Sequence, residues 1–427
     1  MIGLLFLIFT ICLLLGIPII ISIGIATYFV LKEVGIPLVI LAKSIYTATD
    51  NFPLHAIPFF ILAGAFMEEA GMSEEIIGVM EKAVGRVRGG LAIATVLGCM
   101  FFATMSGSGP ATACAIGFIV IPAMVSRGYA KDFAGALSGS AGTLGILIPP
   151  SNPMIVYGVI GQVSIVGLFM AGFIPGLFVT TVLILIAYVI CRRRGYGEKT
   201  LEVSFRDFLV ACWRNKWSLL TPVIILGGIY GGVFTPVEAA VVAADYSLLV
   251  GLLITKKLNM QKIYSSLSKT CLICGVMIVF IGLSTAFGEL LTLAQAPQKV
   301  GYLLSTISND WRVIYLIIIA FLVALGCIMD TMATIIILTP ILLPVMVNLG
   351  VDPIHFGIIF VVTNEIAFLT PPVGANLFAM VAVTGLPIER ISREEIPFIV
   401  GLIVAVIILA LVPEITLFLP RIAGYLH

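Results

Sequence analysis

The sequence predicts an all-α polytopic membrane protein made of two inverted-topology repeats, each with a re-entrant helical hairpin and a discontinuous helix. Of its 427 residues, 60% are hydrophobic and 11% are charged, whereas soluble proteins carry about 25% charged residues. Uncharged stretches such as residues 2–31 and 165–191 exceed the ~20 apolar residues that a membrane helix needs. The alternation typical of membrane barrels is missing. These observations favour a bundle of membrane helices.

Charge and cysteine usage exclude several classes of function. The chain has 23 Lys and Arg against 22 Asp and Glu, so it offers no basic surface for nucleic acid. Its eight cysteines fall mostly in apolar runs and its three histidines lie in separate segments. No zinc site or nucleophilic cluster can be assembled from them. We therefore do not expect an enzyme, and the lack of a repeated filter loop argues against a channel.

The first half, residues 1–191, is expected to form the first repeat. Residues 3–31 are not preceded by the basic region of a signal peptide, and this apolar run is about twice as long as the hydrophobic region of a signal peptide. The run therefore predicts a first membrane helix. Residues 91–126 are too long for one crossing and contain the polar sequence 106–110, which predicts a re-entrant hairpin. A broken helix is expected at 132–160. The remaining crossings of this half are 52–70 and 165–191.

The second half, residues 217–427, follows the same order. A hairpin is expected at 313–348, where residues 326–334 interrupt the apolar sequence, and a broken helix at 356–386. A basic linker, residues 192–216, joins the halves. Single crossings are expected at 217–235, 238–255, 271–290 and 396–419. Two amphipathic segments, 73–86 and 297–307, are expected to lie along the membrane surface as arms, although an ordinary extramembrane helix fits almost as well.

The distribution of basic residues supports this path of the chain across the membrane. With a cytoplasmic N-terminus and hairpins that do not cross, 18 of the 23 Lys and Arg lie on the cytoplasmic side, as the positive-inside rule requires. The five outside are Lys32, Lys43, Lys299, Arg312 and Arg421. The linker is then cytoplasmic, and the two halves have opposite orientation.

A weak internal repeat agrees with the threading. A shift of 222 positions places the sequence 121–125, Ile-Pro-Ala-Met-Val, over 343–347, Leu-Pro-Val-Met-Val. The same shift places Leu-Ile-Pro-Pro at 147–150 over Leu-Thr-Pro-Pro at 369–372. Inverted repeats with paired broken segments are typical of secondary transporters whose site lies near the membrane midplane.

Four breaks carry the site hypothesis, at residues 105–110, 145–153, 326–331 and 370–376. Proline removes an amide donor and frees backbone carbonyls, which can hold sodium together with hydroxyls such as those of Ser106 and Thr370. The amide ends of the following half-helices suit an anion. Each half supplies one hairpin and one broken helix, so two related cation sites are expected.

Four acidic residues lie within or beside the predicted membrane segments. Asp330 lies in the second tip, where it is expected either to contact substrate or a cation or simply to cap a helix. Glu365 precedes the last break and is expected to orient backbone or add charge there. Glu238 follows Thr235 and Pro236, which predicts a role at a helix N-terminus. Asp245 has no evident partner in the sequence.

At these breaks the sequence resembles the large membrane subunit of TRAP (tripartite ATP-independent periplasmic) transporters. The matching segments run along the whole chain, and together they are specific. They are Ile-Pro-Phe-Phe-Ile-Leu-Ala-Gly (57–64), Ser-Gly-Ser-Gly-Pro-Ala (106–111), Ile-Pro-Pro-Ser-Asn-Pro (148–153), Phe-Thr-Pro-Val-Glu-Ala-Ala (234–240), Leu-Thr-Pro-Ile-Leu-Leu-Pro (338–344) and Leu-Thr-Pro-Pro-Val-Gly (369–374). The second tip departs from the family because Asp330 lacks the aromatic residue that often precedes it by two positions and the Pro or Gly that often follows it.

The resemblance implies an elevator-type, sodium-driven importer in the bacterial inner membrane. It implies two partners, a small Q-type membrane subunit and a P-type periplasmic binding protein that delivers an organic acid. No ATP is needed, and the chain has no Walker motif. The cargo class is sialic acid, sugar acid or C4-dicarboxylate, and the Ser-Gly-Ser-Gly-Pro tip is compatible with a sialic- or sugar-acid carrier. The alternative is a stand-alone sodium- or proton-coupled carboxylate carrier.

The resemblance also implies the site residues. Substrate would lie near Ser108, Asp330 and Thr331. The first sodium site would use Ser106, Gly145, Ile148 and Pro150, mostly through carbonyl oxygens. The second would use Gly326, Met329, Thr370 and Val373.

Overall fold

The computed structural model describes residues 1–197, 204–308, 310–371 and 374–425. These residues form helices and no strand. Within them, six helices are long and apolar enough to cross a membrane, or up to nine spans if each of three bent helix pairs is counted as one. The all-α polytopic class is therefore confirmed, whereas the inverted repeats and their boundaries at 1–191, 192–216 and 217–427 remain predictions.

The N-terminal run contains two helices where the sequence predicts one. α1 (Ile2–Leu14) and α2 (Ile19–Val34) pack against each other. The chain turns between them because Gly16 has a φ of 76°, open mainly to glycine, and because Pro18 cannot donate an amide hydrogen bond. The prediction of a single helix over 3–31 is wrong, since hydropathy alone does not register this short break.

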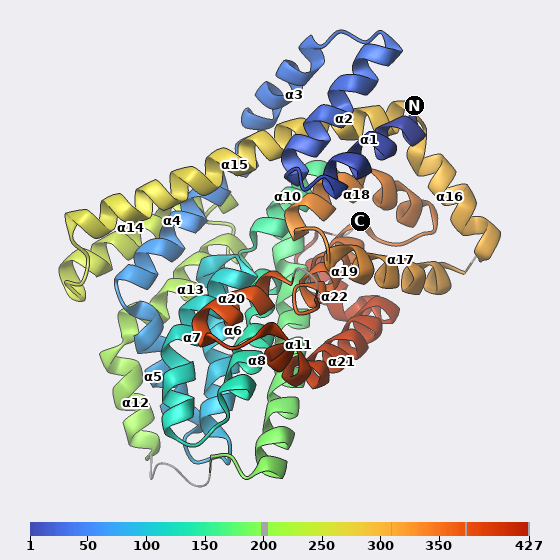
Figure 1. Cartoon of the computed structure of the whole chain (residues 1–427). Coiled ribbons are helices and arrows are strands. Elements are labelled where there is room, and N and C mark those ends of the chain that lie inside the picture. Colours follow the sequence, from blue (N-terminus) through green and yellow to red (C-terminus); the bar gives the residue numbers. More distant parts are fainter. Residues whose placement is uncertain (198–203, 309, 372–373, 426–427) are drawn as a thin grey trace.

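A long helix, α15 (Met260–Leu293), runs obliquely across the molecule and divides the view in Figure 1. In this view α3 (Val39–Thr49) lies above α15, α2 crosses it, and α4 (Ala56–Glu69) packs against its other end. Most helices of the two predicted hairpins and broken helices lie below it in this view. α15 therefore packs against α2, α3 and α4 and also against the second predicted hairpin, residues 313–348.

Each predicted hairpin corresponds to two helices that pack on each other. In the first half these are α6 (Gly90–Ser106) and α7 (Gly109–Ser126), and in the second α17 (Trp311–Gly326) and α18 (Thr331–Asn348). The predicted broken helices are also interrupted. The first contains α8 (Lys131–Gly142), α9 (Leu144–Leu147) and α10 (Asn152–Gly161), and the second contains α19 (Pro353–Ala367) and α20 (Ala375–Thr384).

The other helices complete the chain. The expected arms correspond to α5 (Met72–Val84) and α16 (Ala296–Ile307). Thr235 and Glu238 form reciprocal hydrogen bonds at the start of α14 (Pro236–Leu249), which confirms the helix N-terminal role of Glu238. The remaining elements are η1 (Phe52–His55), α11 (Ile165–Arg194), α12 (Phe205–Arg214), α13 (Lys216–Tyr230), η2 (Val250–Ile254), α21 (Ile388–Leu411) and α22 (Pro413–Ile422).

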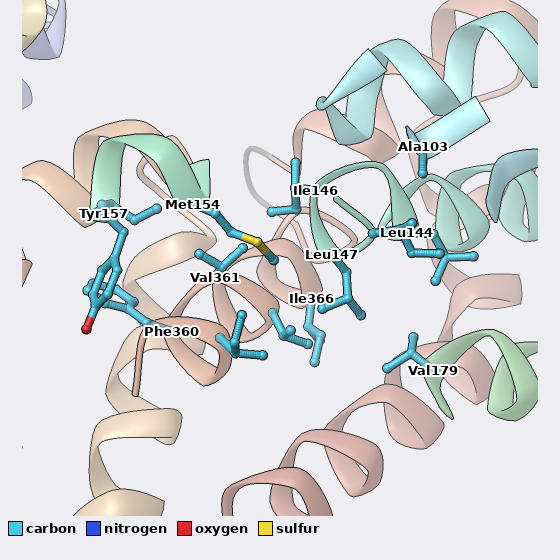
Figure 2. Close-up of a cluster of buried hydrophobic side chains, with 14 of the residues drawn as sticks. Ala103, Leu144, Ile146, Leu147, Met154, Tyr157, Val179, Phe360, Val361 and Ile366 are labelled. Atoms are coloured by element: carbon cyan, nitrogen blue, oxygen red, sulfur yellow. The ribbon is translucent and has the colours of Figure 1, made fainter. Parts of the chain in front are cut away.

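Side chains from both halves pack around the first broken helix, as Figure 2 shows. Leu147 of α9 and Met154 of α10 lie in the same buried cluster as Val361 and Ile366 of α19. The hydroxyl of Tyr157 also donates a hydrogen bond to the Pro353 carbonyl at 2.8 Å. In a membrane such packing, rather than removal of apolar surface from water, stabilises contacts between helices. The two halves therefore share a single hydrophobic core, which includes side chains next to the breaks.

Candidate functional site

A cavity of about 380 Å³ lies where the turns of both hairpins meet α4 and α15. Ser108 lines it from the first hairpin, and Asp330 and Thr331 line it from the second. α4 contributes Glu68 and α15 contributes Lys269. The three residues predicted to bind substrate thus share one cavity, although more than 220 positions separate the two hairpin turns in sequence.

Hydrogen bonds among Ser106, Ser108 and Thr112 stabilise the first hairpin turn, residues 106–109. Gly107 has a φ of 57°, which favours glycine, and Ser108 is extended. The Ser106 hydroxyl lies within hydrogen-bonding distance of the Thr112 hydroxyl, and Thr112 donates to the Ser108 carbonyl at 2.8 Å. A polar turn placed among apolar helices is stable because these groups pair with one another.

The first broken helix contacts this turn directly. The backbone N–H of Asn152 donates a hydrogen bond to the Gly107 carbonyl at 3.4 Å. A methyl group at Gly145 would collide with the Ser108 carbonyl and the Thr112 hydroxyl, so only glycine fits there. A methyl group at Gly107 would lie 3.3 Å from the Pro150 carbonyl oxygen. Ser106, Gly145 and Pro150 therefore surround one turn.

Ile148, the fourth predicted residue of that set, is placed differently. It follows α9, and its buried side chain lies against Gly176 of α11. Its backbone amide donates to the Leu144 carbonyl at 3.1 Å, within its own segment and not to the hairpin turn. The structure therefore gathers three of the four residues predicted for the first cation site.

The second hairpin turn, residues 327–330, is more open and carries a charge. Asp330 precedes α18 and caps it, because its Oδ2 accepts the Met332 amide hydrogen at 2.9 Å. Its side chain is nevertheless exposed and lines the cavity. Thr331 is buried, and its hydroxyl has no hydrogen-bond partner among the described residues. Capping therefore accounts for one oxygen of Asp330 and leaves the residue facing the cavity.

The second broken helix faces the end of α17. A methyl group at Gly326 would lie 2.6 Å from the Ala367 side chain and 3.3 Å from Asn364 Oδ1. Within the described part of the chain, the buried Asn364 Oδ1 has no partner, and the buried Thr370 hydroxyl lies beside the Cys327 side chain. Gly326 and Thr370 thus flank the same helix end. Met329 is buried in the turn, and Val373 lies outside the described residues.

Glu365 connects the two halves of the site. It is buried, lines the cavity, and its Oε1 accepts a hydrogen bond from Asn376 Nδ2 at 3.1 Å. A methyl group at Gly109 would collide with the same Oε1, so the carboxylate lies against the first hairpin turn. Its other oxygen has no partner among the residues that the structure describes.

Two charged residues of the cavity are not recognisable as site residues in the sequence. Glu68 stands near the end of a predicted crossing, and Lys269 precedes the apolar run 271–290, where it looks like a cytoplasmic flank. In the structure both line the cavity. An ammonium group and several carboxylates therefore share this space, which suits an organic anion bound together with cations.

Comparisons with known proteins identify the family. The family model described as "Tripartite ATP-independent periplasmic transporter, DctM component" matches residues 6–415. The C4-dicarboxylate TRAP transporter large permease protein DctM of Pseudomonas aeruginosa is 41% identical over 90% of both chains. The sialic acid TRAP transporter large permease protein SiaM of Vibrio cholerae is 36% identical, again over 90% of both.

A longer relative and a solved structure extend the comparison. The isethionate TRAP transporter permease protein DctMQ of Oleidesulfovibrio alaskensis is 41% identical over 96% of this chain, which spans 65% of that protein. The crystal structure of the Alcanivorax borkumensis YdaH transporter matches with a TM-score of 0.64 and 15% identity, over 88% of this chain and 87% of that one. The YdaH match concerns the fold alone. On the family model and the relatives, the chain belongs to the DctM component family of tripartite ATP-independent periplasmic transporters.

Proposed function

We propose that the chain imports an organic acid by sodium-coupled secondary transport, with substrate held in the cavity between the two hairpin turns. The observation that carries this proposal is the convergence of Ser108, Asp330 and Thr331 with Lys269 on that cavity. Lys269 supplies a positive charge for an acidic group, and the hydroxyls offer hydrogen bonds to the rest of the molecule.

The substrate class follows from the relatives. The curated relatives are named for isethionate, C4-dicarboxylates and sialic acid, which are all organic acids. A cavity of about 380 Å³ lies in the range of small-molecule sites. The proposed cargo is therefore a small organic acid, and the sequence resemblance favours the sialic acid, sugar acid or C4-dicarboxylate class.

Sodium is the proposed co-transported ion, at about two sites. The first is assigned to Ser106, Gly145, Ile148 and Pro150, and the second to Gly326, Met329, Thr370 and Val373. Support for the second comes from two buried oxygens, Asn364 Oδ1, which has no partner in the described residues, and the hydroxyl of Thr370. Buried oxygens of this kind are costly unless they bind something, and sodium favours oxygen ligands at broken helices.

The mechanism and partners complete the proposal. The cavity lies between the hairpin turns and the helices α4 and α15. In an elevator mechanism, the two hairpins and broken helices would move together past these helices and carry the cavity across the bacterial inner membrane. A periplasmic binding protein (P-type) would deliver the acid, and a small TRAP membrane subunit (Q-type) would flank the chain.

Reconstituted uptake tests the proposal. The chain is placed in proteoliposomes with its small subunit, and uptake of labelled sialic acid and C4-dicarboxylates is measured with and without a sodium gradient and binding protein. Uptake that requires both is expected. Uptake that requires neither would overturn the tripartite, sodium-coupled proposal and favour a stand-alone carrier.

A further inference from the structure

A second buried carboxylate lies outside the cavity. Glu395 of α21 has no exposed surface, and neither of its carboxylate oxygens has a partner among the described residues. The preceding residue, Glu394, is satisfied differently, by an ion pair with Arg194 at 2.7 Å. An ionised carboxylate enclosed without a partner is strongly unfavourable, whereas a protonated carboxyl group is neutral.

The surroundings of Glu395 are tightly packed. Gly139 of α8 lets α20 and α21 approach, because a methyl group there would lie 2.7 Å from Glu395 Oε1 and 3.0 Å from Met380 Cγ. One helical turn earlier, a methyl group at Gly135 would lie 2.9 Å from Thr384 Cγ2. The described residues also contain no group of three His, Cys, Asp or Glu side chains that could hold a metal ion. This environment suits a proton better than a metal cation.

Within the described part of the chain, no opposite charge pairs with Glu395. α21 packs against α8, α11, α17, α19, α20 and α22. The titratable groups on α21 and these helices are Glu389, Arg390, Arg393, Glu394, Lys131, Asp132, Tyr188, Cys191, Arg192, Arg193, Arg194, Arg312, Tyr315, His355, Glu365, Glu414 and Arg421, with none on α20. Among the described residues, no ion pair or hydrogen bond joins any of these groups to Glu395.

A short chain of contacts leads from Glu395 toward the cavity. The Glu395 carboxyl lies against Gly139, and Asn376 Nδ2 lies 3.4 Å from the carbonyl oxygen of that glycine. The same amide nitrogen donates to Glu365 Oε1 at 3.1 Å, and Glu365 lines the cavity. A change in the packing of Gly139 would therefore reach both Glu395 and the cavity.

We propose that Glu395 is a proton-binding site, occupied while α21 packs on Gly139, and that its proton is linked to transport through Asn376. The carboxylate binds one proton from water and returns one proton to water when this packing opens. The link to transport rests on the proposed function, because it requires the cavity to be the transport site. The occupied proton site itself does not.

Infrared spectroscopy of the purified protein tests the proton site without substrate. A neutral carboxyl group has a C=O stretching band that shifts on exchange into deuterium oxide. We expect part of this band to disappear at neutral pH in Glu395→Gln, which resembles the neutral acid in shape. The full carboxyl band should remain in Glu389→Gln, which is a matched change at an exposed position on the same helix.

Identical carboxyl bands in wild type and a folded Glu395→Gln would overturn the proposal. Glu395→Asp gives a second test if Glu395→Gln does not fold. Because the aspartate side chain is shorter, its carboxyl group no longer contacts Gly139. The carboxyl C=O band should therefore shift in frequency. An unchanged carboxyl band in Glu395→Asp would also contradict a proton held at this contact.

Proteoliposomes then test the link to transport. We expect a pH gradient to change uptake in wild type and Glu389→Gln, and to have no effect in Glu395→Gln. An equal response to pH in Glu395→Gln would disprove the link. If wild type shows no uptake of any organic acid, the proposed function fails, whereas the infrared result still decides the proton site.

Discussion

The two hairpin turns occupy corresponding places in the chain but differ in chemistry. The first turn is held by hydrogen bonds of the Ser106 and Thr112 hydroxyls and the Ser108 carbonyl. The second exposes Asp330 and has a buried Thr331 hydroxyl without a described partner. Internal pairing fixes a turn before any ligand arrives, whereas unpaired oxygens gain most when a ligand binds. We therefore infer that the first turn mainly shapes the site and the second mainly responds to ions and substrate.

The largest effect is expected at the second turn. Asp330→Ala should abolish uptake while membrane insertion remains intact, because it removes the charge that faces the cavity. A lost hydrogen bond to a charged group is worth about 1.5–3 kcal/mol, or roughly 10–150-fold in binding, and the lost helix cap costs about 1 kcal/mol more. Uptake and membrane content are measured together.

Asp330→Asn separates the two roles of this residue. Asparagine caps helices nearly as well as aspartate, so the stability of this variant should stay near that of wild type. Its uptake should still fall, because the charge is gone. Wild-type uptake by either variant would remove Asp330 from the site.

The next effect tests the shape of the first turn. Gly145→Ala should lower uptake strongly, because the added methyl group collides with the Ser108 carbonyl and the Thr112 hydroxyl. Overpacking of this kind costs about 1–3 kcal/mol. Gly3→Ala is a matched control, since a methyl group at Gly3 meets no atom within 4 Å. Equal uptake by both variants would show that the first turn tolerates displacement.

A smaller effect compares the two predicted sodium sites. Thr370→Val should raise the half-saturating sodium concentration about fivefold, as expected for the loss of one oxygen ligand worth about 1 kcal/mol, with little change in thermal stability. Ser106→Ala should lower both sodium affinity and stability, because it also breaks the pair with Thr112. Sodium titrations of uptake and thermal unfolding distinguish them. The same loss of stability in both variants would contradict the contrast between the turns.

The smallest effect is expected away from both turns. Thr235→Ala removes the cap of α14, where the Thr235 hydroxyl accepts the Glu238 amide hydrogen at 3.3 Å. Stability should fall by about 1 kcal/mol with no change in the sodium requirement. A changed sodium dependence in this variant would mean that stability alone alters the sodium response, and the Thr370 result would lose its meaning.

Helix class and breaks could be predicted because glycine and proline mark them. The hairpin helices end within a few residues of the predicted limits, and the interruptions around Ser106 and Asp330 follow from local sequence. The break between α1 and α2 was missed because one glycine and one proline hardly change the hydropathy of a long apolar run. Glycine and proline residues therefore predict the positions of the turns better than they predict the number of helices.

Contacts between distant segments could not be predicted. Lys269 and Glu68 are about 200 positions apart and reach one cavity only through the packing of α15 with α4. Glu395 looks like one of several charges at the start of α21, and its burial depends on the approach of α8 at Gly139. A single sequence records the identity of these side chains and not which helix covers them.

The most direct test of the account is the accessibility of position 108. Ser108→Cys is introduced after the exposed Cys271 is changed to serine, and a membrane-impermeant thiol reagent is applied from each side. We expect labelling from the cytoplasm in the inward-open state, and protection in the outward-open state. Labelling only from the periplasm under every condition would contradict both the topology and the transport site.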